Sequence, residues 1–126
     1  MRRDNRSAAL ATWDYVRAVA LALPGAGEII YHGDPWITVG SKGFVQTWRG
    51  RVLMKLEKGH QELLFEVRPE VFSPMMAGRL RWSWVEIEAL DDDEAAALVR
   101  EAWTQIVPKK VSRALFLPHM GRVDGA

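Results

Sequence analysis

The chain has 126 residues, of which 48% are hydrophobic, with no cysteine and a formal net charge of +1. This length fits a single domain, expected over residues 1–126, and the lack of cysteine excludes a disulfide framework, thiolate zinc sites and cysteine nucleophiles. No apolar run reaches the ~18 to 20 residues of a membrane span, and the charged start is unlike a signal peptide, so we expect a cytoplasmic protein without a membrane partner.

The first predicted element is a helix from about residue 8 to 23, which follows a loose polar leader at residues 1–7. Ser7 is its predicted cap, and its apolar residues recur every three or four positions along one stripe: Trp13, Val16, Ala20 and Leu23. Pro24 and Gly25 end this helix. Residues 28–31 then return as a first strand, which leads into a turn at residues 32–35.

Residues 36–56, WITVGSKGFVQTWRGRVLMKL, predict three short antiparallel strands, because β-branched and aromatic residues lie between turn signals at 40–43 and 49–51. Alternation places Phe44, Gln46 and Trp48 on one face of the second strand and Val45 and Thr47 on the other. In the third strand it separates residues 52, 54 and 56 from 53 and 55. One face is apolar enough for a core, so we expect helices on one side only.

The rest of the chain predicts a short helix, an irregular segment, one more strand and a C-terminal helix. The short helix spans about residues 60–67 and ends before Pro69, residues 72–80 are irregular, and alternation at 81–90 predicts the strand. The acidic run at 91–94 favours a helix start, so capping is preferred to metal binding. An apolar stripe runs to Ile106, Pro108 ends or kinks the helix, residues 109–117 add further turns, and residues 121–126 form a loose end.

These elements predict an α+β fold of two layers, in which an antiparallel sheet of about five strands has helices packed on one face. Charge is distributed unevenly along the chain. Residues 36–58 carry five Lys or Arg and one Glu, a net of +4, whereas residues 86–101 carry one Arg and seven Asp or Glu, a net of −6. The overall pI near 8.1 is below the value of about 9 that makes nucleic-acid binding an electrostatic expectation. The net charge and its distribution therefore do not identify a binding partner.

Five short motifs accompany these elements between about residues 12 and 115. They are Ala22 to Gly25, Trp36 with the following Lys42, Leu53 to Leu56 around Lys55, Gly78 to Val85 with its Trp84-Val85 end, and Ala102 to Lys110 with its Val107-Pro108-Lys109-Lys110 end. In this order they resemble the MmcQ/YjbR family of small bacterial proteins.

The resemblance implies helices on one side of an antiparallel sheet, similar to the type III secretion chaperone-like architecture. It also implies DNA binding, since the family is commonly described as DNA-binding through a proposed double-wing arrangement of its hairpins, with no reaction established for the class. This chain has Met75-Met76 where family members often have a histidine. A role tied to that histidine is therefore not expected here.

The nucleic-acid interpretation takes basic hairpin side chains as phosphate contacts and nearby indoles as stacking surfaces. Arg49 and Arg51 flank Gly50, so they would project from a hairpin tip as a wing does. The candidate residues are Lys42, Arg49, Arg51, Lys55, Arg79 and Arg81, together with Trp36 and Trp48. With the resemblance, they predict a DNA-binding protein with little sequence specificity. The structural alternative is an ordinary solvated turn with tryptophans in the core.

We predict no enzyme activity, metal or cofactor. His32, His60 and His119 are far apart and form no ligand pair, no phosphate loop or nucleophile elbow occurs, and GAGE at residues 25–28 is better interpreted as a helix stop. Two alternatives remain open. One is a chaperone-like protein-interaction module using an adaptable apolar patch, and the other is a small-ligand binder; the chain would be a monomer or weak homodimer. The patch would consist of Phe72, Met75, Met76 and Leu80.

Overall fold

The computed structural model describes residues 10–76 and 79–114, and at residues 79 and 80 it describes the backbone alone. The elements in chain order are α1 (Trp13–Leu21), β2 (Ala26–Tyr31), β3 (Asp34–Val39), β4 (Lys42–Trp48), β5 (Arg51–Met54), α2 (Lys58–Val67), β6 (Phe72–Met76), β7 (Arg79–Val85), the 3-10 helix η2 (Ile87–Ala89) and α3 (Asp92–Thr104). Residues 109–114 form a further short helix.

The strands form one antiparallel sheet in the order β2-β3-β4-β5-β7-β6. Strands β2 to β5 are consecutive hairpins. The turn residues His32 and Gly33, and likewise Arg49 and Gly50, all have positive φ, as two-residue hairpin turns of type I′ require. The α+β architecture is therefore confirmed, with six strands where the sequence predicts about five.

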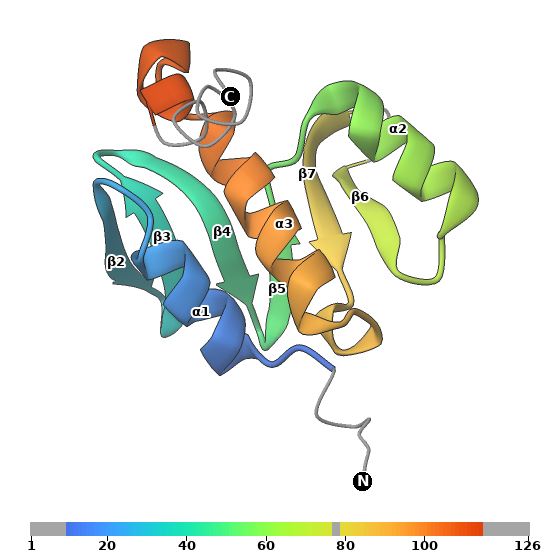
Figure 1. Cartoon of the computed structure of the whole chain (residues 1–126). Helices are drawn as coiled ribbons and strands as arrows, with labels where there is room; N and C mark the ends of the chain where they lie inside the picture. Colours follow the sequence, from blue (N-terminus) through green and yellow to red (C-terminus); the bar gives the residue numbers. More distant parts are fainter. Residues whose placement is uncertain (1–9, 77–78, 115–126) are drawn as a thin grey trace, which may run out of the picture.

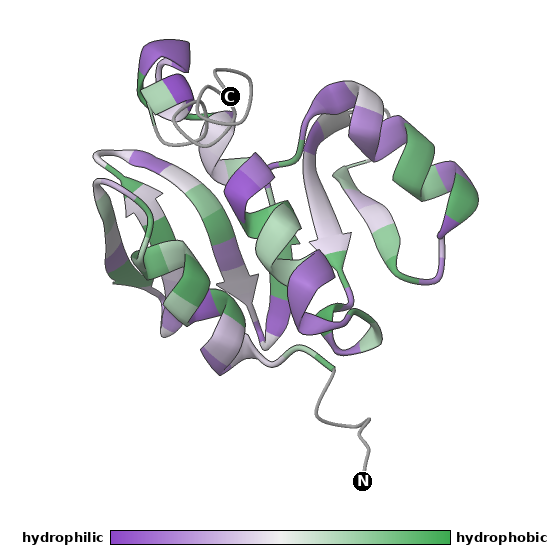
Figure 2. Ribbon diagram, viewed as in Figure 1, coloured by the Kyte–Doolittle hydropathy of each residue, from purple (hydrophilic) through white to green (hydrophobic). Residues whose placement is uncertain are grey.

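The helices lie on one face of this sheet. In Figure 1, α1 and α3 lie in front of the β2–β5 side, and α2 lies in front of β7 and β6. Side chains that point toward them from the middle of the sheet are buried: Ile37, Val45, Val52, Met54 and Val85. Figure 2 shows the acidic start of α3 as hydrophilic and the stretch that crosses the sheet as more hydrophobic. One apolar core thus fills the space between the two layers.

Strand β4 departs from simple alternation at Phe44. The register between β3 and β4 shifts between Ile37 and Thr38, which leaves Phe44 as an extra residue in its strand. Phe44 and Val45 are consecutive, yet both are fully buried in the core. The prediction that Phe44 shares a face with Gln46 and Trp48 is therefore wrong.

The first helix begins later than the sequence predicts. Leu10 forms an isolated bridge with Asp91, and α1 starts at Trp13 with Thr12 as its N-cap, whose Oγ1 accepts a hydrogen bond from the Tyr15 N–H at 3.1 Å. Ser7, the predicted cap, lies outside the described residues.

Two further boundaries differ in the second half of the chain. Residues 72–76, predicted to be irregular, form strand β6, and Pro74 is tolerated there because β6 lies at the sheet edge. Strand β7 ends at Val85 instead of continuing to residue 90, since η2 follows. The predicted capping role of the acidic run is confirmed, because the Asp91 side chain accepts a hydrogen bond from the Glu94 N–H at 2.8 Å.

Candidate functional site

The sheet face opposite the helices, called the helix-free face below, carries one row of cross-strand neighbours. Residues paired across antiparallel strands point to the same side of the sheet. Because Ile37, Val45 and Met54 point into the core, the residues next to them along each strand point away from the helices. The row contains one residue from each strand: Ile29, Trp36, Gln46, Leu53, Trp84 and Ser73.

Four of the six tryptophans lie on the helix-free face. Trp36 and Trp84 belong to the row. Trp48 is two residues from Gln46 on β4, and Trp82 is two residues from Trp84 on β7, so alternation places both on the same face as the row. Trp48 is exposed, and the other three are half-buried. The sequence prediction included Trp36 and Trp48 and missed Trp82 and Trp84, although the alternation at 81–90 contains both.

At one end of this face, the β2–β3 and β4–β5 turns lie side by side. The Arg49 N–H donates a hydrogen bond to Asp34 Oδ1 at 3.1 Å, which joins the two turns. The centres of the Tyr31 and Trp36 rings are 4.6 Å apart, and Arg49 Cζ lies 5.6 Å from the centre of the Trp48 ring. This end, called the paired-turn end, therefore combines aromatic rings with an arginine.

Arg51, at the same end, already has two partners. Its Cζ lies 4.1 Å from the centre of the Trp84 ring, and its Nη2 donates a hydrogen bond to Glu86 Oε2 at 3.2 Å. Glu86 thus offsets the positive charge of Arg51. A cation paired in this way adds less net positive potential than an unpaired one.

The opposite end of the sheet, called the basic end, carries Lys42, Lys55 and Arg81. Lys42 begins β4 and Trp48 ends it, so seven residues of strand, about 20 Å, separate the two ends. Lys55 lies beside Phe44, to whose oxygen its N–H donates a hydrogen bond at 3.1 Å. In the described part of the chain, none of these three cations forms an ion pair.

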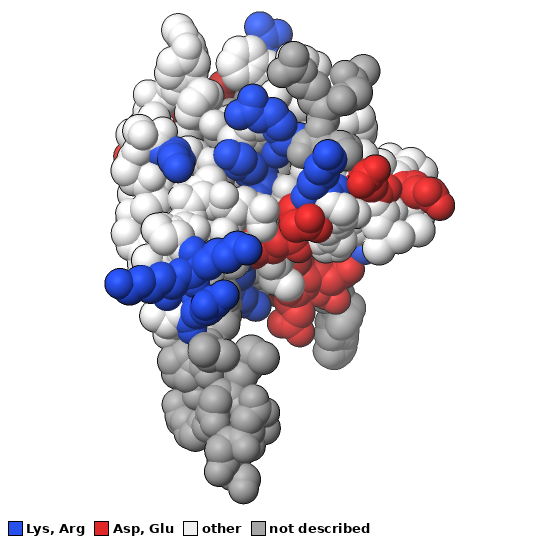
Figure 3. Space-filling model, turned by 90° about the horizontal axis from the view of Figure 1, so that it is seen from above, with Lys and Arg blue, Asp and Glu red and all other residues white. Residues whose placement is uncertain are grey.

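Further cations extend the basic end. Figure 1 places the start of α2 and the helix at 109–114 there, and Figure 3, which looks onto this end, shows Lys and Arg side chains in several groups, with Asp and Glu gathered beside them. Sequence reasoning missed the basic residues of these two segments as binding candidates: Lys58, Lys109, Lys110 and Arg113.

The structure therefore divides the predicted binding residues into two groups. The paired-turn end has Arg49, Arg51 and Trp48, with Trp36 close to it, and the basic end has Lys42, Lys55 and Arg81. Arg79 begins β7 on the side of the basic end, and its side chain lies outside the described residues.

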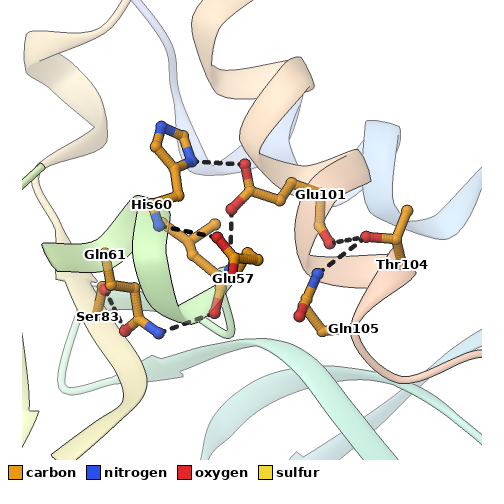
Figure 4. Close-up of polar contacts among 8 residues, drawn as sticks. Glu57, His60, Gln61, Ser83, Glu101, Thr104 and Gln105 are labelled. Carbon is orange, nitrogen blue, oxygen red and sulfur yellow. Dashed lines mark hydrogen bonds and ion pairs between the residues drawn. The ribbon is translucent and has the colours of Figure 1, made fainter. Parts of the chain in front are cut away.

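A separate polar cluster joins α2 to α3 (Figure 4). His60 Nδ1 lies 2.7 Å from Glu101 Oε1, and the other oxygen of Glu101 accepts a hydrogen bond from the Glu57 N–H at 2.9 Å. Glu57 in turn is the N-cap of α2, and hydrogen bonds from the backbone N–H groups of Gly59 and His60 lower the pKa of its carboxyl. These contacts fix the start of α2 against α3.

Gln61 of α2 is fully buried, and its side-chain amide hydrogen-bonds both to the chain just before α2 and to β7. Gln61 Nε2 donates to the Leu56 oxygen at 2.8 Å, and Ser83 Oγ donates to Gln61 Oε1 at 2.7 Å. Of the other histidines, His32 is exposed in the β2–β3 turn, with its ring 4.2 Å from that of Tyr31. His119 lies outside the described residues.

A model of the YjbR family matches residues 21–105, a region that contains every strand of the sheet. This chain belongs to the YjbR family. The predicted resemblance is thereby confirmed, and both groups of candidate residues lie inside the YjbR match. The crystal structure of Deinococcus radiodurans protein DR2400, described as a DUF419 domain, is similar to this YjbR chain with a TM-score of 0.68 and 19% identity, over 83% of this chain and 85% of that one. That likeness supports the fold. The search of curated proteins found no match.

No helix among the described residues has both the length and the hydropathy needed to span a bilayer. Among the same residues, no three His, Asp or Glu side chains come together as a metal-binding group.

Proposed function

We propose that this protein binds DNA in the cytoplasm by contacting phosphates with cations of the sheet, with little base specificity and without catalysis. The observation that carries the proposal is the absence of ion pairs for Lys42, Lys55 and Arg81 within the described residues. Cations that are not neutralised by the protein are available to displace counterions from a phosphate backbone.

The arrangement of the sheet supports this proposal. Lys42 begins β4, Lys55 follows the end of β5 and Arg81 lies near the start of β7, so all three lie at the same end of the sheet. The paired turns lie side by side at the opposite end of the sheet, joined by the bond from the Arg49 N–H to Asp34, and Arg49 offers a cation there without an ion pair among the described residues. Nucleic acid lying along the helix-free face would meet positive charge at both ends.

The test is a fluorescence-anisotropy titration of labelled DNA at about 50 and 200 mM salt, the range in which phosphate contacts are most visible. Two charge-matched double variants separate the ends of the sheet. Lys55→Ala with Arg81→Ala should weaken binding and lower the slope of log affinity against log salt by up to about 2, since each phosphate contact contributes about 0.9. Arg49→Ala with Arg51→Ala should have a smaller effect, because Glu86 already offsets Arg51.

Arg100→Ala serves as the control, since Arg100 is an exposed residue of α3 in the helix layer. It should leave the salt slope unchanged. If neither single-stranded nor duplex DNA binds at about 50 mM salt, DNA binding is wrong. If the Lys55 and Arg81 double variant binds as the unmodified protein does, the basic end is not the phosphate site.

A second candidate function is protein interaction, which one observation favours. Met75 and Met76 are 41% and 52% exposed, and together with Arg81 and Trp82 they line an open cavity of about 220 Å³. Phe72, which the sequence predicted to be part of this patch, is instead buried in the core. Methionine side chains repack readily around different apolar partners. Binding at this patch should depend weakly on salt, whereas phosphate contacts should weaken steeply.

A further inference from the structure

The helix-free face has an unusual number of large aromatic rings for a surface that no helix covers. Trp36, Trp48, Trp82 and Trp84 lie on it, with Tyr31 against Trp36 at the edge. Tryptophans placed only for stability would be expected between the layers, where Trp103 is fully buried. Rings on an open sheet face are typical of proteins that stack bases.

Two of these rings lie in one row, far enough apart to contact different bases of one extended strand. Trp36 on β3 and Trp84 on β7 belong to the same row and are separated by three inter-strand steps, or about 14 Å. Sheets that bind single strands place two or three bases on their aromatic residues. The bases of a duplex are stacked inside the helix, so their faces are not available to the rings.

Two polar groups accompany the rings in the middle of the row. Trp36 Nε1 is buried and has no hydrogen-bond partner among the described residues, a rare condition for a buried donor. The neighbouring Gln46 places its amide over Gly43, where a Cβ would lie 2.8 Å from Gln46 Nε2. An unpaired base presents carbonyl and ring-nitrogen acceptors that a small shift of either side chain would bring into reach.

Arg51 extends the stacking surface. Its guanidinium lies over the Trp84 ring and forms an ion pair with the Glu86 carboxylate. Bases stack on guanidinium planes as well as on aromatic rings. Arg51 therefore contributes a stacking surface in addition to charge, even though Glu86 offsets that charge.

From these observations, we infer that the helix-free face binds single-stranded DNA, with bases stacked on Trp36 and on the Arg51 guanidinium that lies over Trp84, and with phosphates contacted at the basic end. This inference rests on the proposed DNA binding and specifies the form of the DNA. Charge complementarity supports the occupant, because Lys42, Lys55 and Arg81 lie at one end of the same sheet without ion pairs in the described residues. Stacking tolerates any base, which agrees with binding of low sequence specificity.

The experiment compares a labelled oligothymidine of about 12 nucleotides with a duplex of equal length and an oligouridine, with anisotropy and intrinsic tryptophan fluorescence as readouts. The single DNA strand should bind at least tenfold more tightly than the duplex and should quench the indole fluorescence. Trp36→Leu with Trp84→Leu should lower single-strand affinity at least tenfold. Trp36→Phe keeps a ring and should retain most of it.

Trp13→Phe is the matched control, since Trp13 packs against the core on the helix side. It should leave binding and quenching by the oligothymidine unchanged, and circular dichroism confirms that each variant folds. The inference is overturned if the duplex binds as tightly as the single strand, if the leucine double variant binds normally, or if oligouridine binds tenfold more tightly than oligothymidine. Equal binding of duplex and single strand would still support the proposed function, whereas absence of all DNA binding would remove both.

Discussion

The imidazole of His60 and the carboxylate of Glu101 connect α2 to α3 across 2.7 Å, although 41 residues separate them in the sequence. The second oxygen of the same carboxylate accepts the Glu57 N–H, immediately before α2 begins. One acidic side chain of α3 therefore fixes both the first turn of α2 and the residue that caps it.

Glu101→Ala should lower the free energy of unfolding by about 1 to 2 kcal/mol, because it removes two hydrogen bonds to a charged group. Urea denaturation followed by circular dichroism measures this change. Glu62→Ala, an exposed residue of α2, is the control and should stay within about 0.5 kcal/mol of the unmodified protein. Equal effects of the two substitutions would show that the contact adds nothing to stability.

Gly25→Ala should cost about 1 to 2 kcal/mol, since Gly25 has a φ of +77° and a side chain in this left-handed region is strained. The new Cβ would also lie 3.2 Å from Val39 Cγ1. Gly27→Ala, two residues later on β2, has no atom within 4 Å of its Cβ and should change stability little. Thermal denaturation of both variants gives the comparison, and a neutral Gly25→Ala would contradict the strain argument.

Trp103→Ala should lower the free energy of unfolding by about 3 to 5 kcal/mol, because Trp103 is fully buried and its removal leaves a large cavity. Its Nε1 also donates a hydrogen bond to the Pro24 oxygen at 3.1 Å, which joins α3 to the segment between α1 and β2. Trp103→Phe fills most of the space and loses this bond, so its cost should be clearly smaller. Urea titrations rank the variants, and a similar cost for both would assign the effect to the hydrogen bond.

Acid should weaken the contact between α1 and β2. Arg17 donates a hydrogen bond to Glu28 at 2.7 Å, which lowers the pKa of the Glu28 carboxyl. A carboxyl whose pKa is lowered by folding stabilises the native state above its ordinary pKa of about 4.3, and this stabilisation disappears as the pH falls through the lowered value. The stability difference between the unmodified protein and Glu28→Gln should therefore shrink between about pH 6 and pH 3. A constant difference across this range, measured by urea denaturation, would contradict the prediction.

The alternation of polar and apolar residues predicted most of the sheet. In an antiparallel sheet with helices on one face only, each strand alternates between apolar residues toward the core and polar residues toward solvent. It failed at Phe44, where the bulge depends on the pairing of β4 with β3 and leaves no mark in β4 alone. It also failed at β6, because Pro74 argues against a strand unless the strand is known to lie at an edge. Edge position is a property of the assembled sheet.

The candidate site was predictable in its residue types and not in its arrangement. Arg51 and Lys55 are four residues apart. Arg51 begins β5 and Lys55 follows its last residue, so they lie toward opposite ends of the sheet. Trp36 and Trp84 share a row only because β7 pairs with β5, a contact between segments about thirty residues apart. Neither relationship follows from local sequence, whereas the structure makes both evident.

The two edges of the sheet differ in their capacity to add another strand. Pro74 removes a backbone N–H from β6, so this edge is a poor template for pairing. The opposite edge, β2, has exposed Ile29, Ile30 and Tyr31 and contains no proline. An additional strand would therefore find a more complete row of backbone hydrogen-bonding groups at β2 than at β6, which makes β2 the edge more open to extension of the sheet.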